Sequence, residues 1–309
     1  MKRVIEYSSE NHIGQSVRQL LKDNGYSRHL LTFLKKHEAS VMLSSCGNIS
    51  PVYLNHILKQ GEIVIVSINE DASSKNIAPV NIPIDIVYED EDIIIINKPS
   101  DMPIHPSINN HDNTLANALS YYFKEKGEDF IYRCITRLDR DTTGLTLIAK
   151  NPLSAALLSG NPSSINKTYL AICDGIPDKK GSIDVPIARK CDSAIERIAD
   201  YGGEEAHTEY ELLSTISLNT DGKALSYSLV KINLLTGRTH QIRVHFKYIG
   251  HPLPGDFLYN PDYKIINRQA LHCACLSITH PISHKEMTFT SPLPKDMSKY
   301  FNQNTLPGV

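Results

Sequence analysis

The sequence predicts an α+β protein in which a mixed, mostly antiparallel sheet follows a small N-terminal α/β module. Segments typical of strands dominate the chain after residue 83, and most are separated by short turns with few helices between them. The first 70 residues instead contain two short helical segments ahead of their strands. The length of 309 residues, with 41% hydrophobic and 21% charged residues, fits one large domain plus a small one.

Residues 1–70 are expected to form the small module. Apolar residues at helical spacing predict one helix that follows Ser16 and stops at Asn24 and Gly25, and a second helix that begins near Ser27. Short strands are expected at residues 41–43 and 62–68. The polar faces of the two helices carry five basic residues: Arg18, Lys22, Arg28, Lys35 and Lys36. Such a cluster is also common on any solvated helix.

Residues 71–82 are polar and lack hydrophobic periodicity, which predicts a linker, and residues 83–309 are expected to form the main domain. Its strands are expected at residues 84–88, 93–97, 144–150, 167–174, 209–216, 224–234, 269–279 and 286–290. Its helices are expected at residues 114–126, 152–159 and 240–249. The acidic turn of residues 89–92 is interpreted as a solvated loop.

Cysteine usage and hydropathy favour a cytoplasmic protein. The six cysteines are scattered along the chain, which favours reduced thiols. Cys273 and Cys275 lie beside His272, but no second Cys or His pair stands at a spacing typical of zinc sites, so a packed strand is expected there rather than a metal. No apolar segment approaches the length of a membrane span. The formal charge of −2 does not decide whether the protein binds a polyanion, because cations can be concentrated locally.

Residues 135–150, I-T-R-L-D-R-D-T-T-G-L-T-L-I-A-K, place charged side chains at the entrance to an expected buried strand. Arg137, Asp139, Arg140 and Asp141 lie within five residues. Because charges are costly to bury unless they are paired, this cluster indicates a functional site. The residues alone leave open the alternative of a solvated turn with incidental ion pairs.

Five motifs, in the same order along the chain, resemble those of the RluA-type pseudouridine synthases. The stretch around Asp139 is similar to H-R-L-D-x-x-T-S-G-L, with Thr136 in place of His and Thr143 in place of Ser. Residues 97–106 resemble N-K-P-x-G-x-x-x-H-P, with Asp101 in place of Gly. Residues 167–171 resemble K-x-Y-x-A, and residues 236–245 resemble T-G-R-T-H-Q-[LI]-R-V-H. Residues 250–259 resemble G-x-P-x-x-G-D-x-x-Y, a motif from which no catalytic group is expected.

The resemblance implies an isomerase that converts uridine in RNA to pseudouridine with no metal or organic cofactor. It marks Asp139 as the catalytic carboxylate, Tyr169 as the ring that stacks on the target base and handles protons, and Arg243 as the partner of Asp139. It also implies that Arg137 replaces the extruded base in the stack and that Ile242 packs against the target base. Further RNA contacts are expected from the remaining basic residues: Arg238, Lys167, Arg18, Arg28, Lys35 and Lys36. Taken alone, Asp139 is better explained as a cap or ion-pair residue, and spacing does not exclude that Tyr169 is a core residue of a strand.

The resemblance further implies an RNA partner and a cytoplasmic monomer. Ribosomal RNA of the large subunit is the favoured substrate, with transfer RNA next. Residues 1–70 resemble the S-four type of RNA-binding domain, which would add affinity through phosphates. Two rivals stay open: a non-catalytic RNA-binding protein that keeps the fold for ribosome assembly, and a glycosidase. The glycosidase would need two cooperating carboxylates, and Asp141 is the only near neighbour of Asp139 in the sequence.

Overall fold

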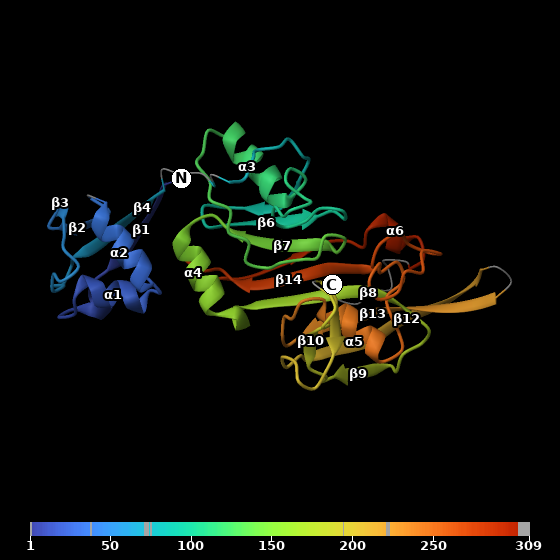
Figure 1. Ribbon diagram of the computed structural model, residues 1–309. Coiled ribbons are helices and arrows are strands. Elements are labelled where there is room, and N and C mark those ends of the chain that lie inside the picture. Colours follow the sequence, from blue (N-terminus) through green and yellow to red (C-terminus); the bar gives the residue numbers. More distant parts are fainter. Residues whose placement is uncertain are drawn as a thin grey trace.

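Two main sheets organise the chain in the computed structural model (Figure 1). The structure describes residues 2–37, 39–70, 74, 76–193, 195–220 and 223–301, so residues 71–73 and 75 of the predicted linker lie outside the described residues. An N-terminal module with its own sheet lies at one end of the molecule, and a long sheet with helices beside it forms the rest (Figure 1). No helix in these ranges is long and apolar enough to cross a membrane.

The N-terminal module packs two helices against an antiparallel sheet of order β1-β4-β2-β3. Its elements are β1 Lys2–Ser8, a 3-10 turn Glu10–His12, α1 Val17–Asp23, α2 Arg28–Lys36, β2 Val41–Ser45, β3 Asn48–Pro51 and β4 Ile63–Asn69. Hydroxyl caps start both helices where the sequence predicts them. Ser16 accepts a hydrogen bond from the N–H of Gln19, and Ser27 accepts one from the N–H of Leu30.

Strands β1 and β3 were not predicted from the sequence. Both are edge strands of the N-terminal sheet. All four residues of β3 are exposed, and β1 buries only Ile5, so neither strand shows a strong hydrophobic pattern. They are strands because β1 pairs with β4 and β3 pairs with β2, and periodicity does not reveal such pairing.

The long sheet is mixed and mostly antiparallel, as predicted. Its order is β5-β6-β7-β14-β8-β13-β12-β9, with β15 paired to β14, and of these pairs only β7 with β14 is parallel. The predicted strands are present as β5 Asp85–Glu89, β6 Ile93–Lys98, β7 Thr143–Ala149, β8 Ile165–Asp174, β12 Thr208–Thr220, β13 Lys223–Leu234, β14 Leu271–Thr279 and β15 Glu286–Thr290. The predicted helices are present as α3 Leu115–Glu125, α4 Pro152–Gly160 and α5 Gln241–Tyr248.

Several short elements were not predicted because they span only three or four residues. These elements are too short to show a hydrophobic period. They are β9 Lys180–Ile183, β10 Ile187–Arg189, β11 Arg197–Ala199, α6 Lys295–Ser298 and a 3-10 turn Pro162–Ser164. Strands β10 and β11 pair with each other as a separate two-stranded ribbon. This ribbon lies beside α5 and contributes to the site described below.

Strand β7 is an interior strand of the sheet, between β6 and β14, and every one of its residues is buried. It pairs with β14 at Gly144, where a side chain would lie 2.2 Å from the carbonyl oxygen of Cys273. Gly144 also has a positive φ of 107°, a conformation that residues with a side chain rarely adopt. Glycine is therefore required at the point where the stretch around Asp139 enters the sheet.

The acidic turn between β5 and β6 is not the solvated loop expected from the sequence. Asp92 is 3% exposed, and its carboxylate accepts hydrogen bonds from Arg3 Nε at 3.0 Å and Arg3 Nη2 at 2.8 Å. Asn151 Nδ2 and Ser154 Oγ of the α4 start donate to the same carboxylate. The expectation failed because these partners come from parts of the chain remote in sequence.

Apolar contacts reinforce this junction between the N-terminal module and α4. Leu153 is fully buried in the core of the N-terminal module, and Leu157 packs against the same core. Gly25, just after α1, lies so close that a side chain there would meet Leu157 Cδ2 at 2.2 Å. The module is thus seated on α4 rather than tethered at a distance.

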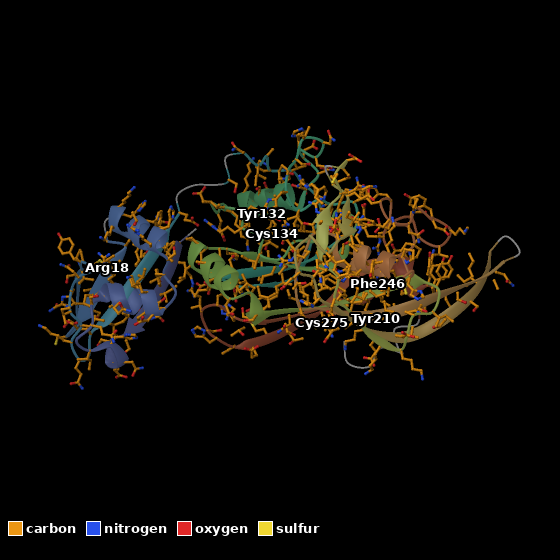
Figure 2. All side chains as sticks on the ribbon, turned by 60° about the horizontal axis from the view of Figure 1, so that its bottom comes forward. Arg18, Tyr132, Cys134, Tyr210, Phe246 and Cys275 are labelled. Carbon is orange, nitrogen blue, oxygen red and sulfur yellow. The ribbon has the colours of Figure 1, made fainter. Side chains whose placement is uncertain are left out.

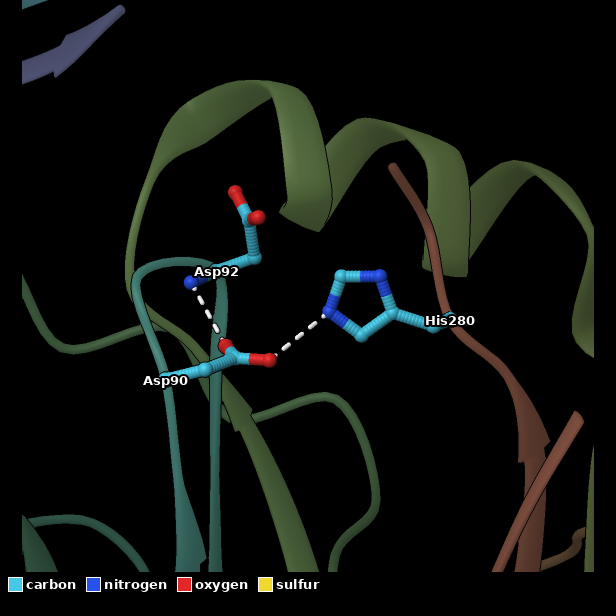
Figure 3. A group of neighbouring side chains, drawn as sticks. All are labelled: Asp90, Asp92 and His280. Atoms are coloured by element: carbon cyan, nitrogen blue, oxygen red, sulfur yellow. Dashed lines mark hydrogen bonds and ion pairs between the residues drawn. The ribbon is translucent and has the colours of Figure 1, made fainter. Parts of the chain in front are cut away.

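Asp90, Asp92 and His280 gather near this junction with ligand atoms within 4.8 Å of one another (Figure 3). His280 Nε2 lies 2.9 Å from Asp90, which also accepts hydrogen bonds from the N–H groups of Asp92 and Ile93. The guanidinium of Arg3 already supplies a positive charge to Asp92. These hydrogen bonds account for the cluster as a polar junction, and we assign no metal to it.

We expect Arg3→Ala to destabilise the protein by about 2–3 kcal/mol, because it leaves the buried Asp92 carboxylate without its charged donors. Urea unfolding of the full chain measures the effect. Lys2→Ala removes an exposed cation from the same strand and should change the unfolding midpoint little. Equal midpoints for the two variants would show that the ion pair does not hold the junction.

Candidate active site

A cavity at the entrance to β7 brings six of the predicted residues together. It lies where β7, β8 and the start of α5 meet, and its lining includes the following predicted residues: Arg137, Asp139, Tyr169, Arg238, Ile242 and Arg243. Leu138, Thr142, Leu234 and Leu271 complete much of the apolar wall. The residues that the motifs scatter over a hundred positions therefore share one site.

Asp139 and Arg243 form the ion pair that the sequence led us to expect. Arg243 Nη1 lies 2.7 Å from Asp139 Oδ2. The Arg243 side chain is 2% exposed, whereas that of Asp139 is 31% exposed. Asp139 thus faces the cavity, whereas its partner Arg243 is buried behind it.

A second carboxylate, Asp256, holds the other edge of Arg243. Arg243 Nε and Nη2 donate to Asp256 at 2.6 and 2.8 Å, and Asp256 also accepts from the N–H groups of Leu258 and Tyr259. Because Asp256 occupies two nitrogens of the guanidinium, Arg243 contacts Asp139 through Nη1 alone. Oδ1 of Asp139 has no hydrogen-bond partner among the described residues and is available to a substrate.

The charge of Arg243 is maintained against its burial. Burial disfavours the charged form, but the hydrogen bonds to Asp256 and the attraction of Asp139 outweigh it and raise the Arg243 pKa above its ordinary value. Asp256 is fully buried, so the two charges compensate each other out of water. The sequence analysis gave Asp256 no role, although it stands in the motif of residues 250–259.

Gln241 shapes the loop that leads into α5. Its side-chain oxygen accepts hydrogen bonds from the Arg238 N–H and the Thr236 hydroxyl, both at 2.9 Å. Its amide nitrogen donates to the carbonyl of His207 and to Thr208 Oγ1. This buried amide fixes the first turn of α5, which carries Arg243.

His240 lies next to Asp139 and lines the cavity. Its Nδ1 is 2.9 Å from the Tyr259 hydroxyl, and its Nε2 is 3.9 Å from Asp139 Oδ2. The Tyr259 hydroxyl also accepts from the backbone N–H of Arg197 on β11. Burial lowers the His240 pKa, despite the attraction of Asp139. A neutral imidazole, oriented by Tyr259, therefore borders the cavity.

Tyr169 lies in β8 with its side chain almost wholly buried at the cavity wall. Burial raises its pKa well above the ordinary value, and nearby Cys273 and Asp139 act in the same direction. The phenol is consequently protonated at neutral pH and can donate a proton or hydrogen bond, but it is a poor base in this state.

Lys98 stabilises the loop that carries Asp139. It is 1% exposed, and its Nζ donates to the carbonyls of Pro99, Met102 and Arg140 at 2.8, 2.9 and 2.8 Å. Burial lowers the Lys98 pKa to about 7, against the attraction of Asp141 and Asp139. Lys98 belongs to the N-K-P motif, but the sequence analysis did not assign it a role.

The positions that depart from the family motifs keep a defined geometry. Thr136 Oγ1 accepts from the N–H of Leu147, and Thr143 Oγ1 lies 2.9 Å from His272 Nδ1. Asp101 adopts the left-handed conformation, with φ of 55°, that glycine favours. Asp101 therefore occupies a backbone conformation that Asp tolerates better than most other residues with a side chain.

Arg137 is exposed at the cavity mouth, and the nearby Asp141 binds Arg140. The predicted residues outside the cavity fall into two groups. Lys167 does not line the cavity. The basic residues of the N-terminal helices lie on a separate module: Arg18, Arg28, Lys35 and Lys36 (Figure 2 labels Arg18).

The chain matches the family model described as RNA pseudouridylate synthase over residues 92–248. It is 36% identical to "Uncharacterized RNA pseudouridine synthase YjbO" of Bacillus subtilis, over 92% of this chain and 97% of the relative. It is 34% identical to "Ribosomal large subunit pseudouridine synthase D" of Escherichia coli, over 94% of this chain and 90% of that relative. The solved structure "Human RNA Pseudouridylate Synthase Domain Containing 1" matches with a TM-score of 0.56 and 27% identity, over 68% of this chain and 83% of that one.

We expect the stability provided by Lys98 to rise with pH. Its pKa is about 7 in the folded protein and near 10.5 when exposed, so between these values the unfolded chain binds the extra proton. The cost of burying the ammonium is therefore complete below pH 7 and declines as the pH rises. Lys98→Met should be less stable than the unaltered chain, with a gap that widens from pH 6.5 to pH 9 in urea unfolding.

Lys124→Met, which removes an exposed ammonium from α3, is the control and should leave the pH dependence unchanged. A constant gap between Lys98→Met and the unaltered chain across this range would show that Lys98 does not titrate there.

Proposed function

From the premise that the chain belongs to the RNA pseudouridylate synthase family, we propose that it isomerises specific uridines of large-subunit ribosomal RNA to pseudouridine. The isomerase activity follows from the family. The substrate is supported by the relative from Escherichia coli, which is named for the ribosomal large subunit and aligns with nearly the whole chain. The observation that carries the proposal is Asp139, held by Arg243 with one oxygen open to the cavity.

The reaction needs a carboxylate and no outside energy. The bond between uracil N1 and ribose C1′ breaks, the base turns, and C1′ joins C5, while C5 loses its proton and N1 gains one. A carboxylate can serve as nucleophile or base at these atoms. We assign this role to Asp139, which pairs with the guanidinium of Arg243 and keeps one oxygen open to the cavity.

We place the target base between Tyr169 and Ile242, which line the cavity on β8 and α5. An aromatic ring and a branched aliphatic side chain can hold a planar base by stacking and packing. Because the Tyr169 phenol stays protonated, it suits the role of a donor to the departing or rotating base.

We assign base extrusion to Arg137. A paired uridine must leave its helix before its sugar bond can be reached, and a planar guanidinium can fill the gap. Arg137 is exposed at the cavity mouth and makes no ion pair or hydrogen bond within the described ranges. Arg238, in contrast, is committed to the carbonyl of Glu205 and the carboxylate of Glu204, and we assign it to the cavity rim.

We further propose that the N-terminal module, with the domain bounds 1–70, 71–82 and 83–309 expected from the sequence, binds RNA phosphates. Helices α1 and α2 enclose a groove of about 540 Å³ whose lining includes four cations: Arg18, Lys22, Arg28 and Lys35. Lys36 is exposed on α2 but does not line the groove. Four cations around one groove, with no acidic lining residue, fit a phosphate backbone.

The structure disfavours the glycosidase alternative. Its second carboxylate would have to reach the cavity, but Asp256 is fully buried behind Arg243 and Asp141 binds Arg140. The non-catalytic alternative requires the site to be incomplete, whereas Asp139, Tyr169 and Arg243 are present and assembled.

We propose that the protein works in the cytoplasm as a monomer. The cysteines are all unpaired, and Cys46 and Cys191 are exposed, which fits a reducing compartment. The monomer is an expectation from the family resemblance, and sedimentation of the full chain measures it directly.

We expect Asp139→Asn to lower the rate of pseudouridine formation by at least about 10³-fold, because the amide cannot replace the carboxylate. The test maps pseudouridine across total RNA from cells that lack the gene and carry either the unaltered chain or the variant. Asp112→Asn, an exposed change of the same kind, should restore every site.

A site in large-subunit ribosomal RNA that requires Asp139 would establish the substrate. A dependent site found only in transfer RNA would replace the proposed substrate. Sites that persist with Asp139→Asn but vanish without the gene would remove Asp139 from the mechanism.

We expect the double variant Arg28→Ala with Lys35→Ala to weaken RNA binding and to reduce the slope of log affinity against log salt by about 1–2, since each lost phosphate contact contributes about 0.7–0.9. Binding to large-subunit RNA transcripts at several salt concentrations measures both effects. Lys36→Ala removes a cation from the same helix outside the groove and should change the slope less. If the slope decreased equally in the double variant and in Lys36→Ala, RNA binding would depend on the overall charge of the module and not on the groove.

A further inference from the structure

A second cleft, of about 690 Å³, lies on the other side of the catalytic loop from the cavity that holds Asp139. Its walls come from the segments after β6 and before β7, from residues 255–268, and from α6 with the residues that follow it. Those used below are Arg140, Phe257, Tyr263, Arg268 and Lys299. The roles assigned so far do not use this cleft.

Phe257 links the wall of this cleft to the site of Asp139. Phe257 lies one residue beyond Asp256, and its ring centre is 5.6 Å from the guanidinium carbon of Arg243 and 5.9 Å from that of Arg140. Arg140 directly follows Asp139 in the chain. Phe257 therefore stands between the arginine that holds the reacting carboxylate and the cleft.

The cleft exposes aromatic rings that the core does not use. Phe257 is 46% exposed and Tyr263 is 47% exposed. Proteins that bind single-stranded nucleic acid use exposed aromatic faces beside cations, because every base offers a face for stacking. Lys299 is exposed in the same cleft, and it makes no ion pair among the residues that the structure describes; its ammonium lies 4.7 Å from the Tyr300 ring centre.

Most of the cations in this cleft are paired with carboxylates, and few are available to a ligand. Arg268 is buried, binds Asp296 through two nitrogens and donates to the carbonyl of Asp141, so it ties the cleft wall to the catalytic loop. Arg140 binds Asp141 and lies 3.7 Å from Asp101. Since most cations are paired, the cleft suits stacking of one base with a single phosphate contact better than it suits a long phosphate track.

We propose that this cleft is a second nucleotide subsite, in which a base adjoining the target uridine in the RNA stacks on Phe257 while a phosphate contacts Lys299. The proposal rests on the RNA substrate argued above and adds a specificity-determining residue to it. A base seated there would anchor the strand beside Asp139 while the target uridine occupies the cavity.

The test uses a synthetic RNA segment that spans the uridine identified by mapping, with tritium at C5 of that uridine so that product formation releases tritium. Each nucleotide within three positions of the target is replaced, one at a time, by an abasic ribose. Phe257→Ala should lower kcat/KM on the intact segment by about 5–100-fold, the range of one base–aromatic stack. Phe257→Tyr should retain most of the activity.

The abasic series distinguishes a subsite from a structural role. If Phe257 stacks on a neighbouring base, Phe257→Ala should cost little further on the one RNA that lacks that base. The same loss on every abasic RNA would mean that Phe257 supports the fold or Arg243 only, and no loss on the intact RNA would also overturn the subsite. Lys299→Ala should mainly raise KM, and Tyr201→Ala, which removes an exposed ring outside the cleft, should leave the rate unchanged.

Failure of the two proposals is distinguishable in this design. If the unaltered chain releases no tritium from any large-subunit segment, the proposed substrate is wrong and the subsite falls with it. If the unaltered chain is active and Phe257→Ala equals it, only the subsite is wrong.

Discussion

The site depends on one buried arginine held between two carboxylates. Arg243 is almost fully buried, and without Asp256 only the partly exposed Asp139 would compensate its charge. Asp256 also decides the geometry, because it occupies Nε and Nη2 and leaves only Nη1 for Asp139. A free guanidinium would take both oxygens of Asp139 in a bidentate pair. The buried Asp256 therefore orients the guanidinium so that Asp139 is held through Oδ2 alone and its Oδ1 stays without a protein partner among the described residues.

The loop that carries Asp139 is held through its backbone carbonyls as well as through its side chains. Lys98 donates to the carbonyl of Arg140, and Arg268 donates to the carbonyl of Asp141 from the side of the second cleft. Both cations are buried, so each can be retained only because several oxygens surround it. These bonds fix the backbone that positions Asp139, which is what a preorganised site requires.

Periodicity and motifs predicted the elements with long apolar patterns and the residues that line the cavity. They did not predict the partners of those residues. Asp256 lies in a recognised motif, but its role follows from a contact with Arg243 that only the folded chain creates. Asp92 reads as part of a solvated acidic turn until Arg3, at the far end of the sequence, is seen beside it. The local sequence pattern indicates which residues are buried and which type of element they form. Which charges pair with each other depends on the tertiary structure.

The junction and the active site lie at opposite ends of the same two strands. Asp92 immediately precedes β6, and Lys98 ends it; β7, antiparallel to β6, begins beside the Asp139 loop and ends just before Asn151, which also binds Asp92. Strands of six or seven residues span about 20 Å at about 3.3 Å per residue. The sheet therefore separates the junction that seats the N-terminal module from the catalytic loop by a fixed length. For an RNA that binds both the module and the active site as proposed, this length sets the distance that its contacts must span.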